Sequence, residues 1–177
     1  MGSRLKKILK RNELYLAYKE VLKRTNKLAD FDSFVSEMEL LHKQKKTRTL
    51  LLSKRMSPDK LIDAGAQSMS YRSRIVEIKV ATQKAQRILA SVIENLEAEI
   101  IANYSEYINE RSIAGKKAYV KSFLSEGYKK LADLNRIVDM GDVFIHDIDQ
   151  SAWALKHMMD GLTLIYNREN IVGSKKL

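Results

Sequence analysis

Lysine and arginine, the side chains that pair with phosphate groups, are concentrated at one end of this 177-residue chain. Residues 1–58 carry 15 Lys/Arg against 6 Asp/Glu, whereas residues 59–177 carry 17 against 16. Nearly all of the net charge of +10 at pH 7 therefore arises before residue 59. A basic field of this kind favours a polyanionic partner, which would be nucleic acid, an anionic membrane face or an acidic protein.

Binding to nucleic acid requires cations that neutralise phosphates, and binding to single strands also requires aromatic rings on which bases stack. The densest cations precede residue 58, and a second group follows on a later helix. The first group is Lys6, Lys10, Lys43, Lys46, Arg48, Lys54 and Arg55, and the second is Arg72, Arg74, Lys79, Lys84 and Arg87. Together they predict contacts to the backbone of a single strand.

Tyrosines stand close to both groups of cations. Tyr71 precedes Arg72 directly and is a candidate stacking platform, as are Tyr15 and Tyr18 by position. Taken singly, each of these tyrosines is better explained as a helix-packing residue. No motif that reads duplex sequence is visible, so base-specific recognition is not expected.

Catalytic and metal-binding patterns are weak. The chain has no cysteine, and its three histidines are His42, His146 and His157. Glu39 and His42 match half of the Glu-x-x-His pattern of di-iron bundles, but no second pair occurs. Glycine-rich phosphate-binding loops are also missing from the sequence. We therefore expect no metal, no cofactor and no enzymatic activity.

The composition predicts an all-α protein, because one proline and seven glycines leave few helix breakers. Hydrophobic periodicity predicts helices over 3–28, 33–52, 58–109, 116–140 and 143–170, with a break at 140–142. Ser57-Pro58-Asp59 has the order of a helix start. Apolar residues then follow a heptad pattern, namely Tyr71, Ile75, Ile78, Thr82, Ala85, Leu89, Val92 and Leu96. We predict a bundle of long helices with coiled-coil-like packing, divided into a basic helical pair (1–58) and a long-helix oligomerisation region (59–177).

Charge alternates in blocks along the second region, which favours self-association. Residues 91–110 hold 5 acids and no base, residues 111–136 hold 7 bases and 2 acids, and residues 137–169 hold 6 acids and 2 bases. Complementary blocks of this kind can register the subunits of a homo-oligomer.

Membrane insertion and export are not expected from the sequence. No apolar run approaches the roughly 20 residues of a membrane span. The cations of the helix predicted over 3–28 are spread around its circumference, so binding to a membrane surface is also unlikely. The N-terminal residues lack the apolar segment of a signal peptide, which predicts a cytoplasmic protein.

From about residue 59 to 170 the chain resembles the phage T4 UvsY-like family of recombination mediators. The resemblance rests on Lys60-Leu61 with Ala64, Ala66 and Tyr71, on the basic segment 79–87, and on the tail from Asp149 through Trp153 to Arg168. It implies a helical protein that binds single-stranded DNA and oligomerises. It also implies that Lys84 and Arg87 contact DNA, that the tail serves assembly, and that a RecA-like recombinase and a single-strand-binding protein are partners. Such a protein would act in the host cytoplasm if it is phage-encoded.

The leading hypothesis is a homo-oligomeric, non-enzymatic accessory protein that binds single-stranded DNA. The alternative is a protein-interaction scaffold, such as a virion or host-takeover component, whose basic face docks an acidic partner.

Overall fold

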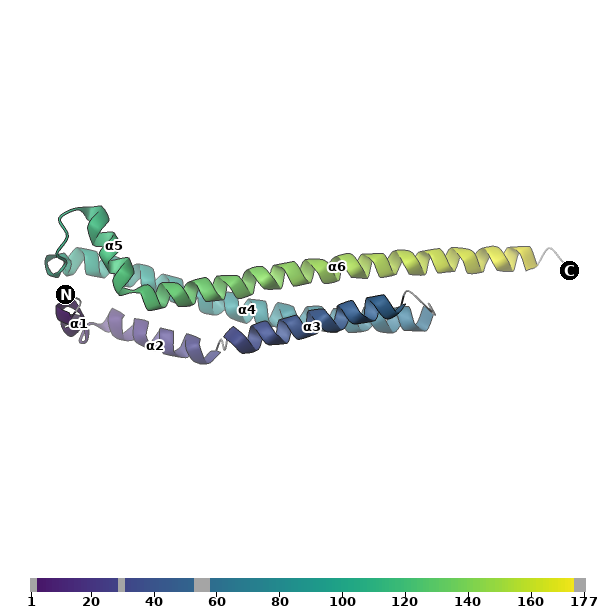
Figure 1. Ribbon diagram of the computed structural model, residues 1–177, viewed down its shortest axis with the longest axis horizontal. Coiled ribbons are helices and arrows are strands. Elements are labelled where there is room, and N and C mark those ends of the chain that lie inside the picture. Colours follow the sequence, from purple (N-terminus) through teal and green to yellow (C-terminus); the bar gives the residue numbers. More distant parts are fainter. Residues whose placement is uncertain (1–2, 29–30, 53–57, 174–177) are drawn as a thin grey trace. The chain divides into compact units, whose positions relative to one another are not determined.

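The described part of the chain is built from α-helices and contains no strand. The computed structural model describes residues 3–28, 31–52 and 58–173, with side chains over 4–25, 32–43 and 59–168. The helices are α1 (Ser3–Leu9), α2 (Glu13–Leu28), α3 (Phe31–Leu52), α4 (Pro58–Asn103), α5 (Ile113–Phe123) and α6 (Ser125–Gly173), with a short 3-10 helix η1 (Ser105–Tyr107) after α4 (Figure 1). The predicted all-α bundle built on long helices is confirmed.

The chain divides into two compact units, each made of segments that are distant in sequence. Unit 1 comprises residues 1–34 and 79–139, and unit 2 comprises residues 35–78 and 140–177. Both α4 and α6 contribute to each unit, where they pack against each other. Unit 1 carries 19 Lys/Arg and 12 Asp/Glu, a net +7, whereas unit 2 carries 13 and 10, a net +3. The boundary predicted at residue 58 follows the charge, while these units follow the packing.

Unit 1 has a continuous apolar core. Its fully buried residues come from α1, α2, α4, α5 and α6, and include Leu5, Leu9, Tyr18, Leu22, Leu89, Ile93, Leu96, Ile100, Val120 and Leu134. On α4 the buried positions follow the predicted heptad pattern, because Leu89 and Leu96 are inaccessible to solvent and Ala85 and Val92 pack beside them. The pattern therefore identified the buried side of α4 correctly.

Unit 2 combines buried apolar residues with polar contacts between its helices. Leu61 and Ala64 of α4 pack with Leu155 of α6. The buried Ser68 hydroxyl donates to the Ala64 carbonyl at 2.8 Å, within the same helix. On α3, His42 Nε2 lies 2.7 Å from Asp147 Oδ2 of α6. Polar contacts therefore add to apolar packing in the helix pairing of unit 2.

The single helix predicted over 3–28 is wrong, because the chain breaks between α1 and α2. Asn12 Oδ1 accepts a hydrogen bond from the Tyr15 N–H at 3.0 Å, which caps the start of α2. The Asn12 amide also lies 3.4 Å from Glu99 Oε1 and 3.3 Å from Tyr104 Oη. Asn12 thus ends one helix run, begins the next and ties the turn to the end of α4.

Replacing Asn12 with alanine is expected to reduce the free energy of unfolding by about 1 kcal/mol, because an N-cap acceptor is lost. Replacement with aspartate keeps the capping oxygen but removes the amide donor that faces Glu99. Thermal denaturation followed by circular dichroism should place Asn12→Asp between the wild type and Asn12→Ala. Equal stability of all three proteins would contradict the capping role.

Two further helix boundaries differ from the prediction. The helix expected to reach residue 109 ends at Asn103 and is followed by η1. The break expected at 140–142 does not occur, because α6 runs through it from Ser125 to Gly173. Gly141 is buried there, so packing outweighs the roughly 1 kcal/mol that glycine costs inside a helix. The start predicted at Pro58 is confirmed, with Asp59 in the first turn.

Candidate nucleic-acid interface

The exposed side of α1 and the turn after it form a surface of cations without an acidic residue. Leu5 and Leu9, one helical turn apart, are fully buried against unit 1. Opposite them the exposed cations are Arg4, Lys6, Lys7, Lys10 and Arg11, which we call the α1 basic surface. None of the five forms an ion pair with a described residue.

The packing of α1 explains this arrangement. The sequence predicted cations spread around the axis of one helix over 3–28. In α1 the apolar Leu5 and Leu9 are turned inward, which leaves the cations of these first turns in solvent. Lys6 and Lys10, both predicted contact residues, lie four positions apart and are both exposed.

Lys84 and Arg87, two further predicted contacts in unit 1, lie exposed on α4. Asn12 contacts Glu99 of the same helix. Since an α-helix rises about 1.5 Å per residue, Arg87 is about 18 Å along the axis from that contact. Lys84 and Arg87 thus form a separate pair of exposed cations.

Arg72 and Arg74, predicted contacts in unit 2, are paired with carboxylates. Arg72 Nε and Nη2 donate to Asp149 at 2.6 and 3.1 Å. Arg74 donates to both oxygens of Glu37 at 2.6 and 3.2 Å, and to Glu77 at 3.1 Å. The hydrogen bonds from the arginines hold the pKa values of Glu37 and Asp149 below their usual range. Their geometry gives both arginines a role in joining α3, α4 and α6.

These ion pairs predict a stability difference that depends on pH. Because the carboxyl pKa values are lower in the folded protein, the pairs stabilise it above the unfolded pKa of about 4 and lose their effect as pH falls through the folded pKa. An Arg72→Met/Arg74→Met variant should have a lower Tm than the wild type at pH 7, and the difference should shrink below pH ~4. Thermal melts between about pH 2 and 7 measure this.

The matched control replaces Lys156 and Arg168, which are exposed cations of α6 with no ion pair to a described residue. A Lys156→Met/Arg168→Met variant should follow the wild-type pH profile. A Tm difference for the arginine variant that stays constant with pH would contradict the pairing.

The remaining predicted contacts are placed as follows. Lys43 is exposed on α3 and Lys79 half-buried on α4, and both make further interactions. Tyr71 is half-buried on α4. The side chains of Lys46 and Arg48 on α3, and the whole of Lys54 and Arg55, lie outside the described residues.

Tyr15 and Tyr18 do not offer stacking surfaces. Tyr15 is 7% and Tyr18 2% exposed, and the Tyr15 ring packs against Phe123 with centroids 6.1 Å apart. Burial raises the pKa of the Tyr18 hydroxyl. The packing role that the sequence favoured for these two tyrosines is confirmed.

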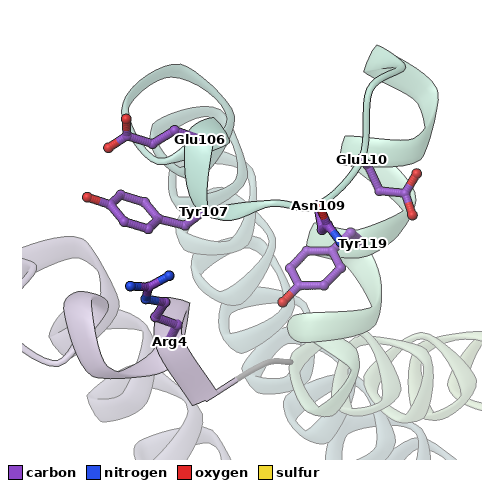
Figure 2. A pocket seen from close by; sticks show the side chains of 6 residues that line it. All are labelled: Arg4, Glu106, Tyr107, Asn109, Glu110 and Tyr119. Atoms are coloured by element: carbon purple, nitrogen blue, oxygen red, sulfur yellow. The ribbon is translucent and has the colours of Figure 1, made fainter.

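A pocket of about 400 Å³ opens beside the α1 basic surface. Arg4 lines it from α1, Glu106 and Tyr107 from η1, Asn109 and Glu110 from the following loop, and Tyr119 from α5. Figure 2 shows the Tyr107 ring and the Arg4 guanidinium on one side of the opening and the Tyr119 ring with Asn109 on the other. The pocket thus combines two aromatic rings, an amide and a guanidinium.

The two carboxylates of the pocket point outward (Figure 2). Glu106 raises the pKa of the neighbouring Tyr107 hydroxyl. Glu110 lies over the start of α5, where a Cβ placed on Gly115 would come within 2.8 Å of Glu110 Oε2. Ser112 caps the same helix by accepting from the Gly115 N–H at 2.9 Å.

Sequence reasoning missed Tyr107, Asn109 and Tyr119 as candidate site residues. They lie about a hundred positions from Arg4 in the chain, so only the folded structure brings them beside it. Arg4, Lys7 and Arg11 could have been selected with Lys6 and Lys10 from the apolar spacing of Leu5 and Leu9, had the helix break at Asn12 been recognised.

No other candidate site stands out within the described residues. The described side chains contain no cluster of three potential metal ligands. His42 contacts Asp147 and stacks on the Phe144 ring with centroids 4.5 Å apart. Among the described helices, none combines the length and apolar character needed to cross a membrane.

Comparisons of the chain with protein-family models, with curated proteins and with solved structures find no match. The resemblance to the UvsY-like family therefore stays a prediction, and the function is inferred from the geometry of the chain.

Proposed function

We propose that this protein is a non-enzymatic, homo-oligomeric accessory factor that binds single-stranded DNA through the α1 basic surface. The observation that carries the proposal is the run of five exposed cations on α1 and its following turn, with Leu5 and Leu9 buried behind them. Fixed cations next to one another can each replace a counterion of the phosphate backbone, and counterion release supplies affinity without regard to sequence.

The α1 basic surface is a better candidate for binding phosphates than the arginines of unit 2. Arg72 and Arg74 are engaged with Asp149 and Glu37, so binding a phosphate would require breaking an ion pair. The α1 cations have no such competitor among the described carboxylates. Lys84 and Arg87 are exposed on α4 of the same unit and are proposed as additional backbone contacts for a strand that extends beyond α1.

Self-association is proposed to use the outer side of α6 in unit 2. Trp153 is 68% and Leu164 70% exposed. Since successive residues of an α-helix are about 100° apart, both lie opposite the buried Ile148 and Leu155. A second copy is the proposed partner, because residues 137–169 are acid-rich and residues 111–136 of another copy are base-rich.

A Trp153→Ser/Leu164→Ser variant should shift the protein toward the monomer in sedimentation-equilibrium experiments. Leu16 and Val80 are also exposed, at 54% and 57%, but lie in unit 1. A Leu16→Ser/Val80→Ser variant is therefore the matched control and should keep the wild-type mass. A wild-type protein that sediments as a monomer would contradict the assembly part of the proposal.

Fluorescence anisotropy with a labelled single-stranded oligonucleotide tests the DNA-binding part. We expect binding that weakens steeply between about 50 and 200 mM salt. Absence of binding at the lower concentration, or an affinity indifferent to salt, would overturn the proposal. Competitors of the labelled oligonucleotide test the alternatives in the same assay. If an acidic polypeptide or anionic vesicles compete more strongly than unlabelled single-stranded DNA, a scaffold or a membrane-surface role is favoured instead.

The resemblance to UvsY-like mediators suggests a place for this activity. An oligomer that binds single strands could help a RecA-like recombinase to replace a single-strand-binding protein. Both of those partners remain proposals that rest on the resemblance.

A further inference from the structure

The pocket beside α1 differs chemically from the α1 basic surface that it adjoins. The surface offers only charge, whereas the pocket offers the rings of Tyr107 and Tyr119, the Asn109 amide and the Arg4 guanidinium. Tyr107 is 40% exposed, so its ring is accessible from solvent. At about 400 Å³ the pocket falls within the size range of small-molecule sites.

The aromatic rings that line the pocket favour a planar ligand. Tyr119 packs against the core of unit 1, which restrains its ring. The accessible Tyr107 ring lies on the other side of the opening (Figure 2). Rings placed in this way accept flat, apolar groups by stacking.

The lining of the pocket also disfavours a simple cation as its ligand. The carboxylates of Glu106 and Glu110 point away from the space between the rings (Figure 2). Arg4 lies at the edge of that space and would repel a basic side chain. A ligand that carries both a flat ring and a negative charge matches the lining better.

We propose that this pocket receives one nucleotide of the bound single strand, with its base at the Tyr107 and Tyr119 rings and its phosphate at Arg4. The inference rests on the proposed function, because the strand is held by the α1 basic surface. Arg4 belongs to both features, so a strand that follows the cations of α1 reaches the pocket without leaving them. Asn109 offers a donor and an acceptor to the edge of the base.

The proposal predicts that bases contribute to affinity as well as phosphates. The probes are a labelled oligo(dT) and an abasic oligomer of the same length, which has the same phosphates but no bases. Stacking on one base contributes about tenfold in affinity. Wild-type protein should bind oligo(dT) about tenfold more tightly than the abasic oligomer at the same salt concentration.

Two substitutions at Tyr107 distinguish base stacking from other contributions of its side chain. Tyr107→Leu keeps apolar volume but has no ring, and should lose the preference for oligo(dT) over the abasic oligomer. Tyr107→Phe keeps the ring and should retain it. Both should show the wild-type dependence on salt, because the phosphate contacts remain, and both should keep the wild-type circular dichroism spectrum.

The outcomes distinguish this inference from the proposed function. If Tyr107→Leu keeps the full preference for bases, or if wild-type protein binds both oligomers equally, the nucleotide pocket is overturned while salt-dependent binding to DNA stands. If neither oligomer binds, both proposals fail. Free dAMP and unlabelled strand can be compared as competitors of the labelled oligo(dT) at the same concentration of nucleotide. If dAMP competes as strongly as the strand, the pocket binds a free nucleotide, and its assignment to a nucleotide of the bound strand is overturned.

Discussion

Replacing Gly127 with alanine is expected to destabilise unit 1 by about 2 kcal/mol, because a core that is already filled would have to accept another carbon. Gly127 is buried near the start of α6. A Cβ at this position would lie 2.7 Å from Tyr18 Oη, 2.8 Å from Tyr18 Cε2 and 3.1 Å from Ile93 Cδ1. Tyr18 and Ile93 are 2% and 1% exposed, so neither can move aside into solvent.

The size of the effect can be read in a thermal melt. For a chain of this length a loss of about 2 kcal/mol lowers Tm by about 4–8 °C. Gly161, on the same helix α6, has no atom within 4 Å of an added Cβ. Gly161→Ala should therefore be neutral or raise Tm, because alanine is favoured over glycine in a helix by up to about 1 kcal/mol. Equal changes for the two variants would contradict the close approach of α2 and α6 at Gly127.

Neutralising three cations of the α1 basic surface, in a Lys6→Gln/Lys7→Gln/Lys10→Gln variant, is expected to weaken binding to single-stranded DNA by about 100-fold in 0.1 M salt. Each phosphate contact to a single strand contributes a factor of about 5 between 1 M and 0.1 M salt, and three contacts multiply to about 100. The substitutions affect exposed side chains, so the fold should be preserved. Fluorescence anisotropy with a labelled oligonucleotide measures the loss.

The matched control has the same change in charge at other exposed cations. Lys129, Lys156 and Arg168 lie on α6 and form no ion pair with a described residue. A Lys129→Gln/Lys156→Gln/Arg168→Gln variant should lose much less affinity, because only the long-range field is reduced. A similar loss in both variants would mean that net charge, and not the α1 basic surface, governs binding.

Much of the fold was predictable because the spacing of apolar residues indicates which side of a helix is buried. The heptad pattern from Ile75 to Leu96 identified the buried side of α4, and Pro58 marked its start. The errors fall where a local signal competed with packing. Gly141 suggested a break that tertiary contacts override, and Asn12 caps α2 inside a run whose apolar spacing suggested one helix.

The candidate site was predictable only in part, for a different reason. Lys6 and Lys10 were found because cation density is visible in a sequence. The pairing of Arg72 with Asp149, across 77 positions, is not visible there. The pocket likewise joins Arg4 to Tyr107 and Tyr119 through the fold. Long-range pairing therefore decides which predicted cations are available to a ligand, and where aromatic rings accompany them.

The most direct test of the α1 basic surface is the dependence of its DNA affinity on salt. A plot of log K against log salt concentration loses about 0.7 of slope for each contact to a single-strand phosphate that is removed. The Lys6→Gln/Lys7→Gln/Lys10→Gln variant is predicted to have a slope shallower than wild type by about 2, with no such change in the α6 control. Parallel lines for wild type and the α1 variant would contradict the proposal that these lysines contact the phosphate backbone.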